Sequence, residues 1–185
     1  MRVSAFGLVS VLALLAAAGP VAAQQAGEPV VYQQPPAPIA AILDSQPSPT
    51  PSLSPDRETL ALYDRSNLPP IEELAEPMLK LAGYRINPRN NGPANSRVSW
   101  LTGLSFQDVS GGAVRRVQLP DGARFTSPSW SPNGKSLAFL VDEQEGMSLY
   151  VASTEGGPAR RLTTARVNAA TGNGFDWLPD GSGLL

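Results

Sequence analysis

The sequence predicts an all-β protein made of short antiparallel strands. Of its 185 residues, 17 are glycine and 19 are proline, so turn-forming residues are frequent. Segments with helical periodicity are few, and this combination favours many strands joined by turns. A motif of strand, turn and strand also occurs three times. Its copies lie at residues 51–64, 126–141 and 174–185.

The repeat has a period of about 45 residues. Gly111-Gly112 and Gly156-Gly157 are 45 residues apart, and the turn residues Asn133 and Asp180 are 47 apart. Four short strands in such a period are typical of a β-propeller blade. We therefore predict a partial β-propeller of four-stranded antiparallel blades. The incomplete propeller is expected at 51–185, with a first blade at 51–120, a second at 123–163 and the start of a third at 172–185.

The second blade shows the pattern most fully. Its strands are expected at 125–130, 136–141, 147–152 and 159–162. The second of these is apolar at nearly every position, so both of its faces should be buried, as they are between stacked blades. Trp130 and Trp177 occupy equivalent positions, and we expect them to pack between blades, not to bind a ligand. Arg160-Arg161 is expected to form a solvated outer edge that resists aggregation.

The first blade contains a short helical insertion at 67–97, after strands expected at 52–54 and 59–63. Asn67 and Pro69-Pro70 suit a helix start. Pro77 should break the helix into two pieces or kink it. A strand at 84–86 and a polar loop at 87–97 should follow. Four apolar residues recur at helical spacing: Ile71, Leu74, Met78 and Leu81.

The carboxylates of the insertion have two interpretations. They are Glu72, Glu73 and Glu76. On the first turns of a helix, they would interact favourably with its N-terminal dipole. A pair of acid–base catalysts is the alternative, and we favour the first interpretation.

The N-terminus predicts a signal peptide at 1–23. Arg2 precedes an apolar run at 6–18, and small residues lead to a cleavage point between Ala23 and Gln24. A membrane anchor is the alternative, but the run is short for a spanning helix. We expect an exported protein, periplasmic or extracellular, with no stable membrane span after cleavage.

A Pro/Gln-rich N-terminal arm should follow at 24–50, with one helical turn at 39–44. Its prolines favour an extended, polyproline-like chain. The alternative is an arm that lies on a neighbouring domain. Its anchors would be Tyr32, Ile39, Ile42 and Leu43.

Composition removes several classes of function. The formal net charge of −2 gives no reason to expect a nucleic-acid partner. The chain has no cysteine and no histidine. It therefore has no disulfide, no thiolate zinc site and no Ser-His-Asp triad of its own. We expect no catalytic, cofactor-binding or metal-binding residue in this chain, and no cofactor.

Several stretches of the chain together carry a resemblance to known proteins. They are Pro35-Pro36, Ile39, Ile42-Leu43-Asp44, Pro51–Asp56, Ser66–Ala75 and Lys80–Pro88. This series is similar to the start of bacterial and plastid proteins of the prolyl oligopeptidase family, most of all its glutamyl endopeptidase branch. The similarity runs from about residue 32 to residue 185, and its most specific part is 68–97. It implies an N-terminal propeller that restricts the access of large substrates to an α/β-hydrolase domain further along.

The family's catalytic serine lies in a G-x-S-x-G turn, with Asp and His as its partners. Residues 103–107 contain Gly103 and Ser105 but lack the last glycine, and no other position matches. The sequence thus predicts the N-terminal, propeller portion of an exported serine peptidase, whose catalytic domain and substrate site lie outside this chain. We expect no activity from the chain alone. The alternative is a non-enzymatic periplasmic propeller that binds a protein or peptide. Cleavage specificity, blade number and oligomeric state stay open.

Overall fold

The computed structural model describes residues 34–66, 68–69, 71–94 and 100–185. The expected signal peptide at 1–23 lies outside the described residues, as do Tyr32, Asn67 and Pro70. The chain divides into two units, Met1–Ala40 and Ala41–Leu185. Helix α2 (Ala37–Leu43) confirms the helical turn expected near 39–44, and none of its residues is buried. Within the described residues, no helix is both long and apolar enough to cross a membrane.

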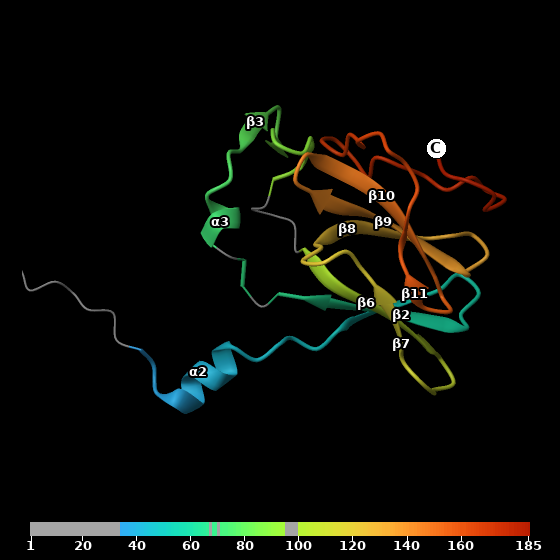
Figure 1. Cartoon of the computed structure of the whole chain (residues 1–185), viewed down its shortest axis with the longest axis horizontal. Helices are drawn as coiled ribbons and strands as arrows, with labels where there is room; N and C mark the ends of the chain where they lie inside the picture. The colour runs from blue at the N-terminus through green and yellow to red at the C-terminus, as the bar shows by residue number, and fades with distance from the viewer. Residues whose placement is uncertain (1–33, 67, 70, 95–99) are drawn as a thin grey trace, which may run out of the picture. The chain divides into compact units, whose positions relative to one another are not determined.

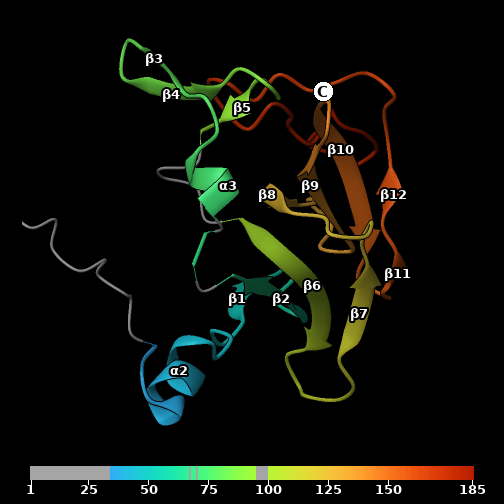
Figure 2. The same cartoon turned by 60° about the vertical axis from the view of Figure 1, so that its left-hand side comes forward.

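The second unit contains a nine-stranded sheet and a smaller three-stranded sheet. We describe the large sheet as two four-stranded antiparallel parts, called the first and the second sheet, with one further short strand. The first has the order β1 (Thr50–Leu53), β2 (Thr59–Arg65), β6 (Leu101–Asp108) and β7 (Arg115–Gln118). Each strand pairs with the next along this path, and β2 pairs with β6 although the insertion separates these two strands in the sequence. Figure 2 shows in green the insertion, which follows β2 and precedes β6 in the chain.

The second sheet has the order β8 (Phe125–Trp130), β9 (Ser136–Glu143), β10 (Gly146–Ser153) and β12 (Arg160–Arg161). Figure 1 shows β8, β9 and β10 side by side. One bridge between β6 and β8 joins the sheets, and β11 (Gly157–Pro158) pairs in parallel with β7. The outer strand expected at 159–162 is shorter than predicted.

The repeat seen in the sequence is also present in the structure, since β6 and β10 begin and end 45 residues apart. The described residues are mostly strand and form antiparallel sheets without a closed ring.

The core confirms that β9 is buried on both faces. Leu137, Phe139 and Val141 contribute to one apolar cluster, together with Phe106 from the first sheet. The intervening Ala138 and Leu140 contribute to a second cluster, whose other members include residues of β10 and of the segment after β12. Alternation along a strand sends successive side chains to opposite faces. An uninterrupted apolar run is therefore what a strand between two layers requires.

The three copies of the motif share one turn geometry. In each, the residue before the turn donates its N–H to the carbonyl five residues later, at 2.8–2.9 Å. The third residue after that donor has a positive φ in all three copies. It is Arg57 (φ 62°), Gly134 (φ 71°) and Gly181 (φ 71°). Arg57 thus occupies a conformation that favours glycine.

These turns lie next to one another in the fold. Lys135 Nζ is 3.1 Å from Asp56 Oδ2, which joins the second turn to the first. A Cβ added to Gly134 would lie only 2.6 Å from Asp56 Cγ. A Cβ added to Gly181 would contact Pro132 at 3.6 Å, which places the third turn beside the second. Equivalent parts of successive repeats are therefore neighbours.

The insertion corrects the predicted helix. In the described part of the insertion, α3 (Ile71–Leu74) alone is helical. Leu79–Leu81 forms strand β3 of a three-stranded sheet with β4 (Tyr84–Asn87) and β5 (Gly92–Pro93). Pro77 has no N–H to continue the helix. Ala82 and Gly83, both with positive φ, then turn the chain so that Leu81 pairs with Tyr84. The polar loop expected at 87–97 contributes β5.

Candidate functional site

The insertion meets the second sheet at a cluster of charged side chains that we call the Arg124 cluster. It consists of Glu73, Glu76, Arg89, Arg124 and Asp142. Glu73 is in α3, Glu76 follows that helix, and Arg89 lies between β4 and β5. Arg124 immediately precedes β8, and Asp142 is near the end of β9. Strand pairing brings the last two together, since Phe125 lies opposite Val141.

Arg124 is the centre of the cluster. Its Nε donates to Asp142 Oδ2 at 2.7 Å, its Nη1 to Glu73 Oε2 at 3.0 Å and its Nη2 to Glu76 Oε1 at 3.0 Å. The guanidinium also lies 4.9 Å from the ring centroid of Trp100, in cation–π contact. The planar guanidinium is suited to several carboxylates at once. One side chain thus joins the insertion to the sheet.

The carboxylate of Asp142 also accepts hydrogen bonds from Arg89 and Asn90, in addition to that from Arg124. Arg89 Nη2 is 2.8 Å from its Oδ2, and Asn90 Nδ2 is 2.7 Å from its Oδ1. The side chain of Asp142 is only 2% exposed. A buried carboxylate requires such compensation, because removing it from water is costly.

Further hydrogen bonds hold the polypeptide on either side. Arg89 Nη1 donates to the carbonyl of Glu143 at 2.9 Å. Asn87 donates its side-chain amide to Glu76. Asn90 Oδ1 accepts the N–H of Gly92 at 2.9 Å, which fixes the turn into β5. The side chains that the insertion buries against the sheet are therefore largely polar.

Burial raises the pKa of Glu73, and the adjacent Arg124 opposes that shift. The interpretation of Glu73 and Glu76 as partners of a helix dipole is therefore incomplete. Helix α3 has only four residues, Glu76 follows it, and both carboxylates contact Arg124. Glu72 is exposed. No sequence pattern points to this cluster, because its two halves lie about 50 residues apart.

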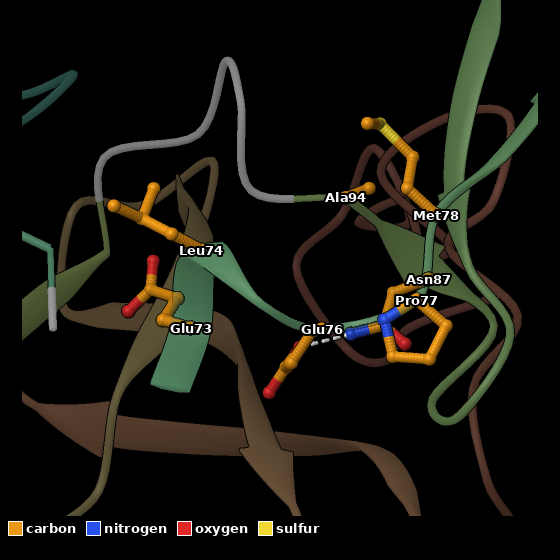
Figure 3. A pocket seen from close by; sticks show the side chains of 7 residues that line it. All are labelled: Glu73, Leu74, Glu76, Pro77, Met78, Asn87 and Ala94. Carbon is orange, nitrogen blue, oxygen red and sulfur yellow. Dashed lines mark hydrogen bonds between the residues drawn. The ribbon is translucent and has the colours of Figure 1, made fainter. Parts of the chain in front are cut away.

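A small hollow adjoins the cluster (Figure 3). Its volume is about 60 Å³, far below the several hundred Å³ of ordinary ligand pockets. It has room for a few water molecules but not for a peptide. The residues that line it are Glu73, Leu74, Glu76, Pro77, Met78, Asn87 and Ala94.

The interactions of the Arg124 cluster join the insertion to the second sheet. The cluster contains no serine, threonine, cysteine or lysine, and its carboxylates accept hydrogen bonds from arginine and asparagine side chains. In the part of the chain that the structure describes, no three His, Cys, Asp or Glu side chains are grouped to hold a metal ion. The cluster is therefore suited to fixing the insertion in position.

The two tryptophans pack as the sequence predicted. Trp130 Nε1 donates to Ser52 Oγ at 3.1 Å, and Trp177 Nε1 donates to the carbonyl of Ser129 at 3.0 Å. Ser52 and Ser129 lie in the first strands of successive repeats, so each indole contacts the repeat before its own. The Trp130 ring also lies 5.7 Å from that of Phe106.

The predicted outer edge is also exposed, since neither Arg160 nor Arg161 is buried. Arg161 forms an ion pair with Glu143 at 3.2 Å, and its other contact is with the hydroxyl of Ser148 at 2.9 Å. The arginine pair is therefore a solvated edge of the second sheet, as expected.

Comparison with known proteins gives the family. No family model matches the chain. A protein named probable glutamyl endopeptidase, chloroplastic, from Oryza sativa subsp. japonica is 37% identical over 142 residues, covering 71% of this chain and 15% of the relative. A protein of the same name from Arabidopsis thaliana is 36% identical over 167 residues, covering 83% of this chain and 17% of the relative. The chain carries a region of the prolyl oligopeptidase family of peptidases.

A further relative agrees with this assignment. The uncharacterized peptidase YuxL of Bacillus subtilis (strain 168) is 44% identical over 63 residues, which is 34% of this chain and 9% of that protein. The prolyl oligopeptidase region spans about a sixth of the length of the plant relatives. Activities of the whole relatives therefore extend to this chain only as proposals.

Proposed function

We propose that this chain provides the N-terminal propeller portion of an exported serine peptidase. The observation that supports this proposal is the 36–37% identity of the chain, over most of its length, to proteins named probable glutamyl endopeptidase. The propeller restricts substrate access to an α/β-hydrolase domain outside these 185 residues. That domain supplies the Ser-Asp-His triad, which this histidine-free chain cannot form. The substrate is a peptide or protein.

The arrangement of the repeats supports assigning the two four-stranded sheets as blades. Equivalent turns of successive repeats are neighbours, as the Lys135–Asp56 ion pair shows. Each repeat tryptophan donates to the preceding repeat. Strand β9 is buried on both faces, as a blade between two others requires. We assign 51–120 to the first blade, 123–163 to the second and 172–185 to the start of the third, where Trp177 bridges Leu184.

The proposed role of the chain is that of a scaffold. The sheets form the wall of the propeller, and the Arg124 cluster fixes the insertion of the first blade on the second. Export rests on the apolar run at 6–18 and the small residues before Gln24. Cell fractionation, with N-terminal sequencing of the mature protein, tests export: an N-terminus at Gln24 supports it, and a cytoplasmic protein that retains Met1 refutes it.

Assaying the full-length gene product tests the peptidase proposal. We expect hydrolysis of a peptide with an internal glutamate, loss of hydrolysis when the serine of a G-x-S-x-G turn is replaced by alanine, and none from residues 24–185 alone. A full-length protein that lacks such a turn and binds peptides without cleaving them would instead establish a non-enzymatic propeller. Hydrolysis by residues 24–185, free of contaminating protease, would contradict the role as scaffold.

A further inference from the structure

The insertion has an inverted distribution of polar and apolar side chains. Its buried side chains include Glu73, Asn87 and Asn90, which are at most 7% exposed. Its large apolar side chains face solvent instead, in contrast to the cores of the two main sheets. Those apolar residues and their exposures are Leu68 69%, Ile71 80%, Leu74 63%, Met78 37%, Leu79 54%, Leu81 67% and Tyr84 50%.

Strand register gathers part of this set on one face of the small sheet. Leu79 pairs with Ile86, and Leu81 pairs with Tyr84, so the four side chains share a face. Lys80 pairs with Arg85 on the other face. An antiparallel sheet ordinarily packs its apolar face on a core. Here Leu79, Leu81 and Tyr84 on that face are exposed, and Ile86 is partly buried.

The apolar residues of α3 adjoin this face. Leu74 and Met78 line the same hollow, from its two sides (Figure 3). Apolar side chains therefore flank the hollow on the side of α3 and on the side of the β3–β4 hairpin. We call the exposed apolar side chains of the insertion the insertion surface; they are Leu68, Ile71, Leu74, Met78, Leu79, Leu81 and Tyr84.

The size of the insertion surface favours one kind of occupant. Full burial of a Leu-sized side chain corresponds to about 60–120 Å² of apolar area. Seven side chains at the exposures above give roughly 250–500 Å². That is as large as the functional patches of monomers. A stable complex between separate proteins buries roughly 800 Å² per partner, of which roughly 450 Å² is apolar. The insertion surface is therefore at or below the apolar area of such a complex. A smaller contact suffices between parts of one polypeptide, because the connecting chain keeps them at high effective concentration.

Pairing between two copies through the edge strand β3 is disfavoured. Lys80 is the central residue of the three-residue strand. Two such strands aligned antiparallel about a two-fold axis would place Lys80 opposite its equivalent. Like charges directly opposite destabilise a strand pair, and edge lysines commonly prevent such pairing.

We propose that the insertion surface is a contact within the longer polypeptide, covered by an apolar surface of the part outside these 185 residues. The plant relatives leave ample chain for this, because the matched region is only 15–17% of their length. The Arg124 cluster positions the surface by holding the insertion through its polar side. This inference rests on the proposed function, in which the chain is one portion of a longer peptidase.

Cysteine accessibility in the full-length protein tests the proposal. The 185 residues contain no cysteine, so a single one can be introduced. Leu81→Cys reports on the insertion surface. Val109→Cys is the matched control, because Val109 is 51% exposed in the turn after β6. Other cysteines of the longer protein are replaced by serine, and the rate of maleimide labelling is measured in native and in denaturing buffer.

In native buffer, we expect the thiol at 81 to react at least tenfold more slowly than the thiol at 109, with equal rates in denaturant. Equal native rates, for Leu81→Cys and for a second variant, Tyr84→Cys, would overturn the proposal. Protection that disappears on dilution would also overturn it, because a second copy would then be the occupant. Peptidase activity is measured separately. An active protein with a reactive thiol refutes only this inference, and an inactive protein with a protected thiol refutes only the proposed function.

Discussion

Replacing Arg124 by methionine should destabilise the fold more than the loss of any exposed ion pair. The change removes the guanidinium but keeps most of the apolar stem. Asp142, 2% exposed in its side chain, and Glu73, 6% exposed, each lose a charged donor. Breaking a fully buried pair from one side costs about 3–5 kcal/mol. Asp142 keeps Arg89 and Asn90, and Arg124 is itself 23% exposed. We therefore expect a loss of about 2–3 kcal/mol.

The pH dependence of this loss has a defined sign. Burial already raises the pKa of Glu73, and Arg124 opposes the shift. Without Arg124, the pKa should rise further, so that the folded variant binds a proton at higher pH than the unfolded chain does. Stability then increases as pH falls through that raised pKa. The penalty of Arg124→Met should accordingly be largest near neutral pH and smaller in mild acid. Adding Glu73→Gln to the variant should restore part of the stability at neutral pH.

Urea unfolding followed by tryptophan fluorescence measures the effect. The expected loss shifts the midpoint by about 1–1.5 M, for a slope of about 2 kcal/mol per M. Lys135→Met is the matched control, since Lys135 is 59% exposed and its ion pairs lie at the surface. It should cost less than about 1 kcal/mol. Equal losses for the two variants, or a penalty for Arg124→Met that does not change with pH, would refute the reasoning.

Three further predictions concern the repeated turns. Arg57→Gly should stabilise the protein by about 0.5 kcal/mol, because φ at Arg57 is 62° and glycine adopts this conformation without strain; a lower urea midpoint would contradict this. Gly134→Ala should destabilise by about 1–3 kcal/mol, since the new Cβ would meet Asp56 at 2.6 Å, and an unchanged midpoint would be the contrary result. Hydrogen bonds from Ser54 and Glu58, with Lys135, lower the pKa of Asp56 to about 2 from 3.8. The ionised Asp56 should stabilise the fold fully above about pH 4, and this stabilisation should decline towards pH 2. In the Asp56→Asn variant, the free energy of unfolding should therefore fall less steeply between pH 4 and pH 2. An unchanged slope in this range would argue against the lowered pKa.

The sequence alone placed most strands of the second sheet. The repeated turn motif placed β8 at its observed bounds, and the continuous apolar run placed β9 except for its last two residues, because burial on both faces constrains each position of a strand. The repeat spacing also predicted the equivalence of β6 and β10. The turn at Asn133-Gly134 was evident because few residues adopt its backbone conformation.

The insertion and the Arg124 cluster depended on tertiary structure. Helical spacing at Ile71, Leu74, Met78 and Leu81 suggested an apolar stripe on a helix, yet the described residues of the insertion beyond Leu74 are not helical. Its large apolar side chains are exposed. A spacing of three or four residues indicates a helix only if the backbone can continue it, and Pro77 prevents this. Arg124 and Glu73 are 51 residues apart. Their attraction depends on distance in space, not on spacing in the sequence, so only the folded chain shows which charges meet.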